Sequence, residues 1–335
     1  MSFSETPLTI LLADDNADVR MALEYMLHAQ GYNVVAVGDG DDAVAALEEH
    51  QVDLVLLDVL MPGRSGFSVC RHIKSQAETR LIPVVLITGL ANPESRVEGI
   101  ESGADDFISK PLNRDELLAR VRSLLKVKRF TDELESAESV LFMLARSIEA
   151  KDPYTEGHCD RLSRYSSALA ARLALPEDQQ VALRRAGIVH DIGKVSVPEH
   201  ILLKPGPLSA DEREIMESHP LVGERICAPL KSFRMVLPII RHHHEHQDGS
   251  GYPDKLRGDQ IPITARIMQI VDVFDALTTK RPYRAALSAE KAFSILREEC
   301  RRGWWDLRLV NEFEEMLQNA PGMRETFMTP APLLS

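Results

Sequence analysis

Short apolar runs alternate with amphipathic segments along the first third of the chain. Near-continuous Val, Ile and Leu in runs of this length predict strands buried on both faces, as in a parallel sheet. The runs are 8–13, 32–37, 53–58, 82–88 and 105–109. Helical spacing of apolar residues fills the intervals, at 17–30, 40–50, 65–76 and 93–102, and a last helix is expected to begin near Asn113. The pattern predicts a doubly wound α/β domain over residues 1–126, with its ligand site at the carboxyl ends of the strands.

The pattern changes to amphipathic helices alone beyond about residue 152. Glycines and prolines punctuate the intervening turns, and there is little strand signal, so residues 152–335 are predicted to form an all-α domain. The expected helices are 157–173, 176–190, 209–228, 234–244, 262–280 and 289–301.

The connector, residues 127–151, carries an apolar heptad seam. Its residues are Phe130, Leu134, Ala137, Leu141, Leu144 and Ile148. No Pro or Gly occurs from Asn113 to Lys151, which predicts that the last helix of the first domain continues through the connector. Two interpretations stay open: a coiled-coil seam between two copies, or an ordinary amphipathic helix packed on its own domain.

Composition and charge narrow the class of protein. The chain has 335 residues and a net charge of −12, which disfavours binding to nucleic acid or to an anionic membrane surface. We expect no signal peptide at the N-terminus and no membrane span. The four cysteines are far apart without a Cys-x-x-Cys pair, so reduced thiols in a cytoplasmic protein are expected.

Charged and polar residues stand at the ends of the predicted strands of the first domain. Asp14, Asp15 and Asp58 would converge on one edge of the sheet, where three carboxylates repel unless a hard cation such as Mg²⁺ lies among them. Thr88 and Lys110 then remain to hold phosphoryl oxygens.

The first 126 residues resemble the receiver domain of bacterial two-component response regulators. The resemblance is carried by Asp14–Asp15, the run Asp58–Val59–Leu60–Met61–Pro62–Gly63, Thr88–Gly89 and Lys110–Pro111. It implies a flavodoxin-like fold in which Asp58 accepts a phosphoryl group from a sensor histidine kinase. Asp14, Asp15, Asp58 and the carbonyl of Leu60 would bind Mg²⁺, and Thr88 and Lys110 would contact the phosphoryl oxygens. Phe107 would be the aromatic reporter of phosphorylation, and Lys110–Pro111 a cis peptide.

Histidines concentrate in the second half, above all in the stretch 242–246. Such a run is either a solvated loop or part of a metal site, and the other ligands that the chain supplies favour the metal site. These are His158, His190, Asp191, His219 and Asp272. Asp272 is expected to be a buried carboxylate inside an apolar helix, with Asp275 as its supporting companion. Lys194 lies about one helical turn from His190, close enough to neutralise a phosphate.

Nitrogen and oxygen ligands without cysteine disfavour structural zinc and suit two six-coordinate Fe or Mn ions. Two such metals activate a hydroxide for attack on phosphorus, which predicts phosphodiester hydrolysis.

Residues 140–320 resemble the HD-GYP family of cyclic di-GMP phosphodiesterases. The motifs are His190–Asp191–Ile192–Gly193–Lys194 and the run from His243 to Pro253, with its Gly251–Tyr252–Pro253 turn. The resemblance implies one metal held by His158, His190 and Asp272, and another held by His219, His243 and His244, with Asp191 bridging them. His242 and His246 would flank the site.

The resemblance also implies how the substrate is bound. Lys194 would contact its phosphate and assist the leaving group, Arg281 and Arg284 would grip the dinucleotide, and Gly251, Tyr252 and Pro253 would form a turn beside it. Tyr154 stands where some family members carry a Glu that binds a third metal, so two metals are expected.

The chain is therefore interpreted as a phosphorylation-regulated cyclic di-GMP phosphodiesterase, with pGpG or GMP as the product. Cyclic GMP-AMP as the substrate and a non-catalytic adaptor are the alternatives. A DNA-binding regulator is disfavoured because the second half lacks a basic recognition helix, and another HD-superfamily enzyme because of the Gly-Tyr-Pro element and the receiver. We expect a homodimer in which phosphorylation rotates or re-pairs the connector helix.

Overall fold

The computed structural model describes residues 7–89, 93–150, 157–280 and 285–319. The chain forms two compact units, Met1–Ala137 and Glu138–Ser335, and the boundary between them lies within the long helix α5 (Arg114–Glu149). Each unit is described by itself. Within the described residues, no helix is both long enough and apolar enough to span a membrane.

The first unit is built on a parallel five-stranded sheet of order β2-β1-β3-β4-β5. Its strands are β1 (Thr9–Ala13), β2 (Asn33–Val37), β3 (Leu54–Asp58), β4 (Val84–Thr88) and β5 (Asp106–Ser109). All five predicted strands are present. The order reverses between β1 and β3, and in sheets of this type the ligand site lies outside that switch point.

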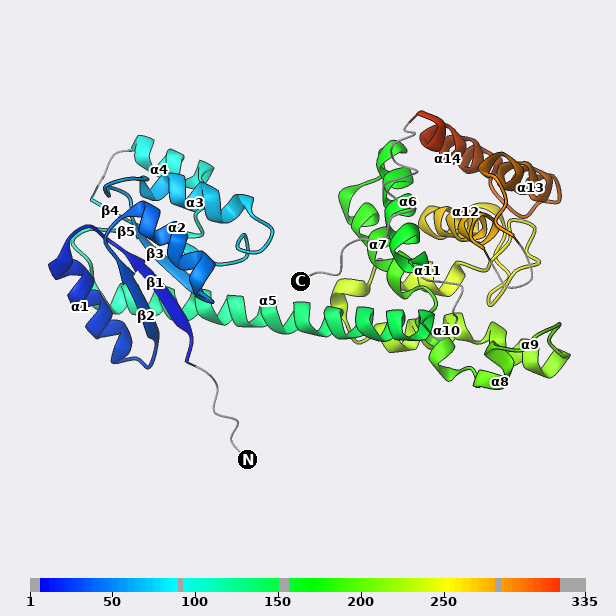
Figure 1. The fold of residues 1–335 in the computed structure, drawn as a ribbon, viewed down its shortest axis with the longest axis horizontal. Coiled ribbons are helices and arrows are strands. Elements are labelled where there is room, and N and C mark those ends of the chain that lie inside the picture. Colours follow the sequence, from blue (N-terminus) through cyan, green and yellow to red (C-terminus); the bar gives the residue numbers. More distant parts are fainter. Residues whose placement is uncertain (1–6, 90–92, 151–156, 281–284, 320–335) are drawn as a thin grey trace. The chain divides into compact units, whose positions relative to one another are not determined.

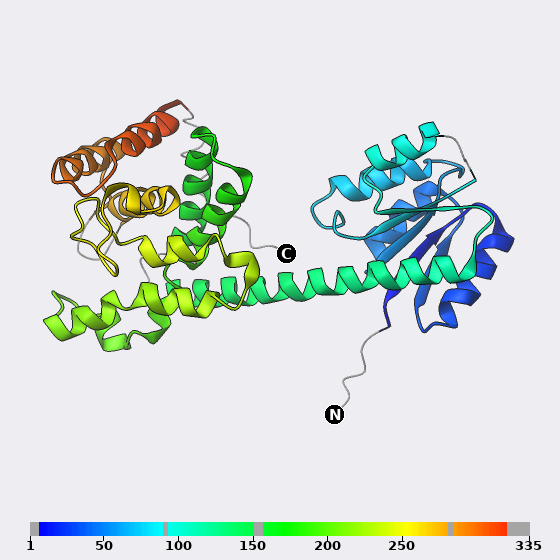
Figure 2. The same cartoon turned by 180° about the vertical axis from the view of Figure 1, so that it is seen from behind.

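Helices cover both faces of this sheet (Figure 1; from behind, Figure 2). They are α1 (Ala17–His28), α2 (Gly40–Glu49), α3 (Gly66–Ser75), α4 (Pro93–Glu101) and the first turns of α5. Successive residues of β1 serve opposite faces: Leu12 packs with α1 and α5, and Leu11 packs with α2 and α3. Burial on both faces explains why the strands read as continuous apolar runs.

Helix α5 begins where the sequence predicts. The side-chain oxygen of Asn113 accepts hydrogen bonds from the backbone N–H groups of Asp115 (2.9 Å) and Glu116 (3.1 Å), which caps the helix. The helix then runs without a break to Glu149.

The heptad seam of α5 divides into two parts. Phe130 and Leu134 are exposed, at 52% and 41%, as is Leu144, whereas Leu141 and Ile148 pack on the core of the second unit. The interpretation as a helix packed on its own domain therefore holds for Leu141 and Ile148, and the coiled-coil interpretation stays a prediction for the exposed part.

The second unit is helical among its described residues, apart from one isolated β-bridge. Its α-helices are α6 (His158–Arg172), α7 (Glu177–Val189), α8 (Glu199–Leu202), α9 (Ala210–Glu217), α10 (His219–Cys227), α11 (Leu237–His242), α12 (Ile263–Thr278), α13 (Ala289–Arg301) and α14 (Leu307–Asn319). The 3₁₀ helices are η1 (Ile192–Ser196), η2 (Lys231–Phe233) and η3 (Gly258–Gln260).

Two sequence expectations for this unit are wrong, and two helices were missed. The helix predicted at 209–228 is two helices, because Pro220 lacks an N–H and disfavours continuation of α9 into α10. The helix predicted at 234–244 is shortened to α11, after a 3₁₀ turn. Helices α8 and α14 were not predicted, although α14 buries an apolar face that includes Phe313.

The core of this unit forms where α6, α7 and α12 meet. Leu162, Ala186 and Ile270 are almost completely buried there, and Phe274 packs edge-on against Tyr165 and Phe313. The apolar character of α12 around most of its circumference follows from this central place.

Gly187 of α7 tests the close approach of α6 and α7. A Cβ at this position would lie 2.3 Å from the backbone nitrogen of Ser163 on α6, so the helices would have to separate. We predict that Gly187→Ala lowers the free energy of unfolding by about 2–3 kcal/mol, measured by denaturant unfolding followed by circular dichroism. Gly89→Ala is the control, because its Cβ would meet nothing within 4 Å. Equal stability of the two variants would contradict this packing.

Candidate active site

Five segments of the second unit bring the predicted ligands together. His158 is the first residue of α6, His190 and Asp191 follow α7, and His219 is the first residue of α10. Asp272 lies in the middle of α12, and His243 and His244 follow directly after α11. Six of the seven therefore lie at a helix end or just beyond it, where a side chain can point into a shared space.

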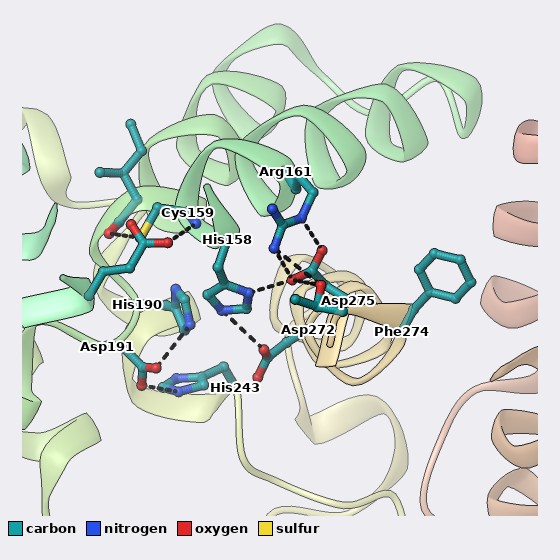
Figure 3. A network of polar contacts seen from close by, with 12 residues as sticks. His158, Cys159, Arg161, His190, Asp191, His243, Asp272, Phe274 and Asp275 are labelled. Carbon is teal, nitrogen blue, oxygen red and sulfur yellow. Dashed lines mark hydrogen bonds and ion pairs between the residues drawn. The ribbon is translucent and has the colours of Figure 1, made fainter. Parts of the chain in front are cut away.

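The seven side chains form two groups. His158, His190 and Asp272 offer ligand atoms that all lie within 4.8 Å of one another. The Nε2 atom of His158 is 3.4 Å from Oδ1 of Asp272; the two side chains point toward each other in Figure 3. Asp191, His219, His243 and His244 form the second group by the same distance criterion.

Asp191 faces both groups. Its Oδ2 atom lies 3.3 Å from Nε2 of His190, and its Oδ1 atom lies 3.1 Å from Nε2 of His219 and 3.7 Å from Nε2 of His243. A carboxylate with one oxygen toward each group can bridge two metal ions.

In His219 and His243, the hydrogen bond made by Nδ1 determines whether Nε2 carries a proton. Nδ1 of His219 lies 2.8 Å from the carbonyl oxygen of Met216, and Nδ1 of His243 lies 2.7 Å from that of Ile240. A carbonyl can only accept, so both Nδ1 atoms donate, and in the neutral rings both Nε2 atoms carry lone pairs. These Nε2 atoms lie only 3.3 Å apart.

Acceptor atoms that converge in this way repel unless a cation lies among them. His190 is completely buried, and neither of its ring nitrogens has a hydrogen-bond partner among the described residues. Oδ1 of Asp191 likewise has no hydrogen-bond donor there. Such orphaned buried atoms are costly, and a divalent metal would satisfy them. The residues fit a metal centre.

The charge states suit metal ligands as well. Burial lowers the pKa of His243, and it lowers the pKa of His244 well below the usual range, so both rings are neutral at physiological pH. Burial alone would raise the pKa of Asp191, but Lys194 and His190 outweigh it and hold that pKa well below its usual range. Neutral imidazole and ionised carboxylate are the forms that bind metals.

His158 differs from the other histidines because a carboxylate supports it. Its Nδ1 atom lies 2.7 Å from Oδ2 of Asp275, and Arg161 donates from Nε to Oδ1 of Asp275 at 2.6 Å (Figure 3). A carboxylate partner orients the ring and raises its basicity toward a metal. Arg161 was missed by sequence analysis because it is 114 residues from Asp275 along the chain.

The expectation that Asp272 is a buried carboxylate is wrong. Its side chain is 22% exposed, whereas that of Asp275 is 3% exposed. Asp272 lines a cavity, and Asp275 is the buried acid of this helix, stabilised by His158 and Arg161.

A cavity of about 380 Å³ opens beside the first group. One part of its lining is polar and includes Asp191, Lys194 and His244; another is apolar and includes Ile148, Ile188 and Leu277. The Nζ atom of Lys194 lies 2.5 Å from Oδ2 of Asp191, so the ammonium lies at the edge of the candidate metal centre. The cavity can hold a ligand with a charged group and an apolar body.

The turn that contains Gly251, Tyr252 and Pro253 packs on the candidate ligand His244. The Tyr252 ring stacks on that of His244 with 4.8 Å between centroids, and the Tyr252 N–H donates to the His244 carbonyl at 3.1 Å. A Cβ on Gly251 would lie 2.3 Å from the His246 nitrogen, so only glycine fits. Tyr252–Pro253 is a cis peptide, and burial raises the pKa of the Tyr252 hydroxyl.

Glu245 holds the chain just after this turn in place. It is completely buried and accepts hydrogen bonds from the backbone N–H groups of Asp254 (2.6 Å) and Leu256 (3.0 Å). Sequence analysis gave Glu245 no role, although it lies within the motif. His242 pairs with Asp254 and His246 with Ser250, so neither belongs to the two ligand groups.

The first unit has a site of its own at the carboxyl ends of its strands. Asp14, Asp15 and Asp58 offer oxygens within 4.8 Å of one another. Nζ of Lys110 lies 2.7 Å from Oδ2 of Asp58 and 2.9 Å from Oδ2 of Asp14. Burial raises the pKa of Asp58 despite this ammonium. Thr88 ends β4 nearby in the sheet, next to the end of β3.

Two further expectations concern this unit. Lys110–Pro111 is a cis peptide, which confirms the prediction. Phe107 packs at the edge of the core, where a Cβ on Gly99 would lie 2.2 Å from its ring. Three other residues with predicted roles, Tyr154, Arg281 and Arg284, lie outside the described residues.

Comparisons with known proteins agree with this division. Residues 10–122 match the family model of the response regulator receiver domain, and residues 142–309 match that of the HD domain. A probable cyclic di-GMP phosphodiesterase of Vibrio cholerae is 37% identical over 323 residues, covering 86% of this chain and 73% of the relative. The cyclic di-GMP phosphodiesterase response regulator RpfG of Xanthomonas campestris is 36% identical, covering 86% of this chain and 82% of the relative.

A third relative matches about half of this chain. The 3′3′-cGAMP-specific phosphodiesterase 3 of Vibrio cholerae is 39% identical over 161 residues, which cover 48% of this chain and 35% of the relative. The receiver match, the HD match and the long relatives together identify the family. The chain belongs to the response regulators that join a receiver domain to a divalent-metal-binding HD domain of the HD-GYP type.

Proposed function

We propose that this protein is a phosphodiesterase that hydrolyses cyclic di-GMP at a two-metal centre under the control of receiver phosphorylation. One observation carries the proposal: each carboxylate oxygen of Asp191 faces a different group of imidazoles. Two metals that share a bridging carboxylate form the arrangement that cleaves phosphate esters in many hydrolases. The names of the two long relatives support the choice of substrate.

The ligand assignment follows the two groups. His158, His190 and Asp272 would hold one metal, His219, His243 and His244 the other, and Asp191 would bridge them. Nitrogen and oxygen donors without thiolate favour Fe or Mn. When bound, two such ions activate a water for in-line attack and stabilise the charge that develops on phosphate.

The chain's own residues then orient the substrate. The Lys194 ammonium at the edge of the centre neutralises the phosphate and donates a proton to the leaving 3′-oxygen. Tyr252, held against His244, forms a wall with its hydroxyl protonated. Water adds to phosphorus as the ester bond to the 3′-oxygen breaks, which opens the ring to pGpG; cleavage of the second bond would give GMP. Arg281, Arg284, Gly251 and Pro253 stay predictions as substrate contacts.

Cyclic GMP-AMP is the second candidate substrate. It is favoured by the 39% identity to the cGAMP-specific phosphodiesterase of Vibrio cholerae, and it offers the same phosphodiester bonds. Initial rates on the two dinucleotides, each alone and then in competition, distinguish the candidates.

Loss of the bridging carboxylate should lower both the metal content and the rate of hydrolysis. For Asp191→Asn we expect no more than one metal per chain and hydrolysis slower by at least about 100-fold. The protein is purified without oxygen, Fe and Mn are measured by mass spectrometry, and loss of cyclic di-GMP is followed by chromatography. Asp259→Asn is the control, because that side chain is 98% exposed. Intact substrate in the presence of fully loaded wild-type protein would favour a binding adaptor instead.

The receiver would supply the regulation. A receiver domain implies a sensor kinase as partner, and we infer a histidine kinase that phosphorylates Asp58 in the cytoplasm. Asp14, Asp15 and Asp58 would bind Mg²⁺, whose charge offsets their repulsion. Lys110, already paired with Asp58, and Thr88 would contact the phosphoryl oxygens.

Phosphorylation should depend on one carboxylate and on Mg²⁺. With acetyl phosphate as the donor, we expect wild-type protein to gain one phosphoryl group, and Asp58→Asn or protein treated with EDTA to gain none. Mass spectrometry of the intact protein makes the measurement. Asp18→Asn, an exposed acid in the first turn of α1, should behave as wild type. Equal labelling of Asp58→Asn would move the acceptor to another residue.

We also infer a homodimer formed through α5. Phe130 and Leu134 expose apolar surface one helical turn apart, and Leu144 continues the same seam. Pairing of two α5 helices would bury these side chains, and each large apolar side chain contributes about 1.5–3 kcal/mol when fully buried.

Charges on this seam should separate the copies. We expect the double variant Phe130→Glu and Leu134→Glu to sediment as a monomer where wild type sediments as a dimer, because two pairs of like charges would meet in the interface. Ser139→Glu, on the side of the helix away from the seam, is the control. Monomeric wild-type protein at all concentrations in analytical ultracentrifugation would rule out this dimer.

A further inference from the structure

Helix α6, whose first residue is the proposed ligand His158, receives no cap from the side chain of its N-cap residue. The residue before it is Gly157, with φ of +72°, and no side-chain hydrogen bond caps the helix from that position. The first turn of a helix leaves its backbone N–H groups without partners inside the helix, so an acceptor must come from elsewhere. His158 belongs to this turn.

The acceptor comes from the last residue of the connector helix. Oε1 of Glu149 accepts a hydrogen bond from the backbone N–H of Cys159 at 3.0 Å. Cys159 is the second residue of α6 and the direct neighbour of His158 (Figure 3). A carboxylate at this end of a helix is also favoured by the helix dipole.

A second contact joins the same two turns. Nη2 of Arg146 lies 2.9 Å from Oδ1 of Asp160, the third residue of α6. The first turn of α6 is therefore tied to the last turn of α5 through the two residues that follow the proposed ligand His158.

The last turn of α5 also lines the cavity. Ala145 is buried at 4% exposure, and Ile148 and Glu149 line the same space as Asp191 and Lys194. Further back along the helix, Phe130 and Leu134 are exposed. The last turn of the connector helix thus forms part of the lining of the cavity beside the candidate metal centre.

His158 is the ligand that a shift of this turn would reach first. The Nδ1 atoms of His219 and His243 bond to carbonyls of Met216 and Ile240, which belong to other segments. The neighbour of His158 bonds to Glu149. Fraying of the first turn of α6 would move Nε2 of His158 away from Asp272, now 3.4 Å distant.

We propose that Glu149 is a positioning residue for His158: it caps α6 from the connector helix, so that a displacement of α5 by the receiver changes metal binding by His158, His190 and Asp272. The inference rests on the proposed function for the role of these ligands. It deepens that function by naming the contact through which phosphorylation reaches the centre.

Metal release measures the positioning without reference to catalysis. Full-length protein loaded with Mn²⁺ is mixed with an excess of chelator, and the rate of metal transfer is followed. We expect Glu149→Ala to release the metal held by His158, His190 and Asp272 about five to ten times faster than wild type, as for the loss of a helix cap. Glu149→Gln should stay within about twofold of wild type, since its amide oxygen can accept the same hydrogen bond.

Two controls separate this effect from general damage. Glu135→Ala makes the same substitution at an exposed position of α5 and should match wild type. Circular dichroism of Glu149→Ala should show native helix content, and Glu149→Gln keeps the proposal testable if Glu149→Ala does not fold. Wild-type release rates in Glu149→Ala, or equally fast release from Glu149→Gln, would overturn the capping role.

The relay has a test of its own. Beryllofluoride with Mg²⁺ imitates the phosphoryl group on the receiver; we expect it to change the release rate of wild type and Glu149→Gln, and to leave that of Glu149→Ala unchanged. Turnover of cyclic di-GMP under the same conditions should show the same pattern in kcat, with a smaller change in KM. A wild-type release rate that is the same with and without beryllofluoride would overturn the relay. Fully loaded wild-type protein that leaves cyclic di-GMP intact would overturn the proposed function instead, while the release rates would still test Glu149.

Discussion

The structure of the second unit depends on lone pairs that converge without a proton between them. The Nε2 atoms of His219 and His243 and Oδ1 of Asp191 meet within 3.1 to 3.7 Å, with the outer nitrogen of each ring already committed to a carbonyl. Burial lowers the pKa of His243, so protonation of that ring at physiological pH does not relieve the repulsion. A cation does, and the helices that supply these groups are therefore coupled to metal binding.

The side chains around this centre are supported from different distances along the chain. His219 and His243 are held by local backbone carbonyls three residues away, and the turn on His244 is held by the completely buried Glu245. His158 instead depends on Asp275, 117 residues distant, and on a helix start that is capped from α5. A support from a distant segment ties the position of the supported side chain to that segment, whereas a support three residues away does not.

The sequence predicted those features that depend on local pattern. The five strands were found because burial on both faces leaves continuous apolar runs, and the continuity of α5 because nothing from Asn113 to Lys151 interrupts a helix. The sequence motifs identified the candidate metal ligands. Features set by long-range contacts could not be predicted. Asp272 lines a cavity and Asp275 is buried, and the contacts with Arg161 and His158 determine which of the two acids is buried. The cap from Glu149 is invisible for the same reason.

Helix α5 shows why one apolar pattern leaves two interpretations open. Its early residues Leu117 and Val121 are buried beneath the sheet, its late residues Ala145 and Ile148 pack in the helical core, and its middle exposes Phe130 and Leu134. A heptad seam reports only that one stripe of the helix is apolar, and does not say what covers each part. Because the helix is unbroken, a rotation at its first turns would be carried to its last turn. That turn contains Glu149, which caps the helix of His158.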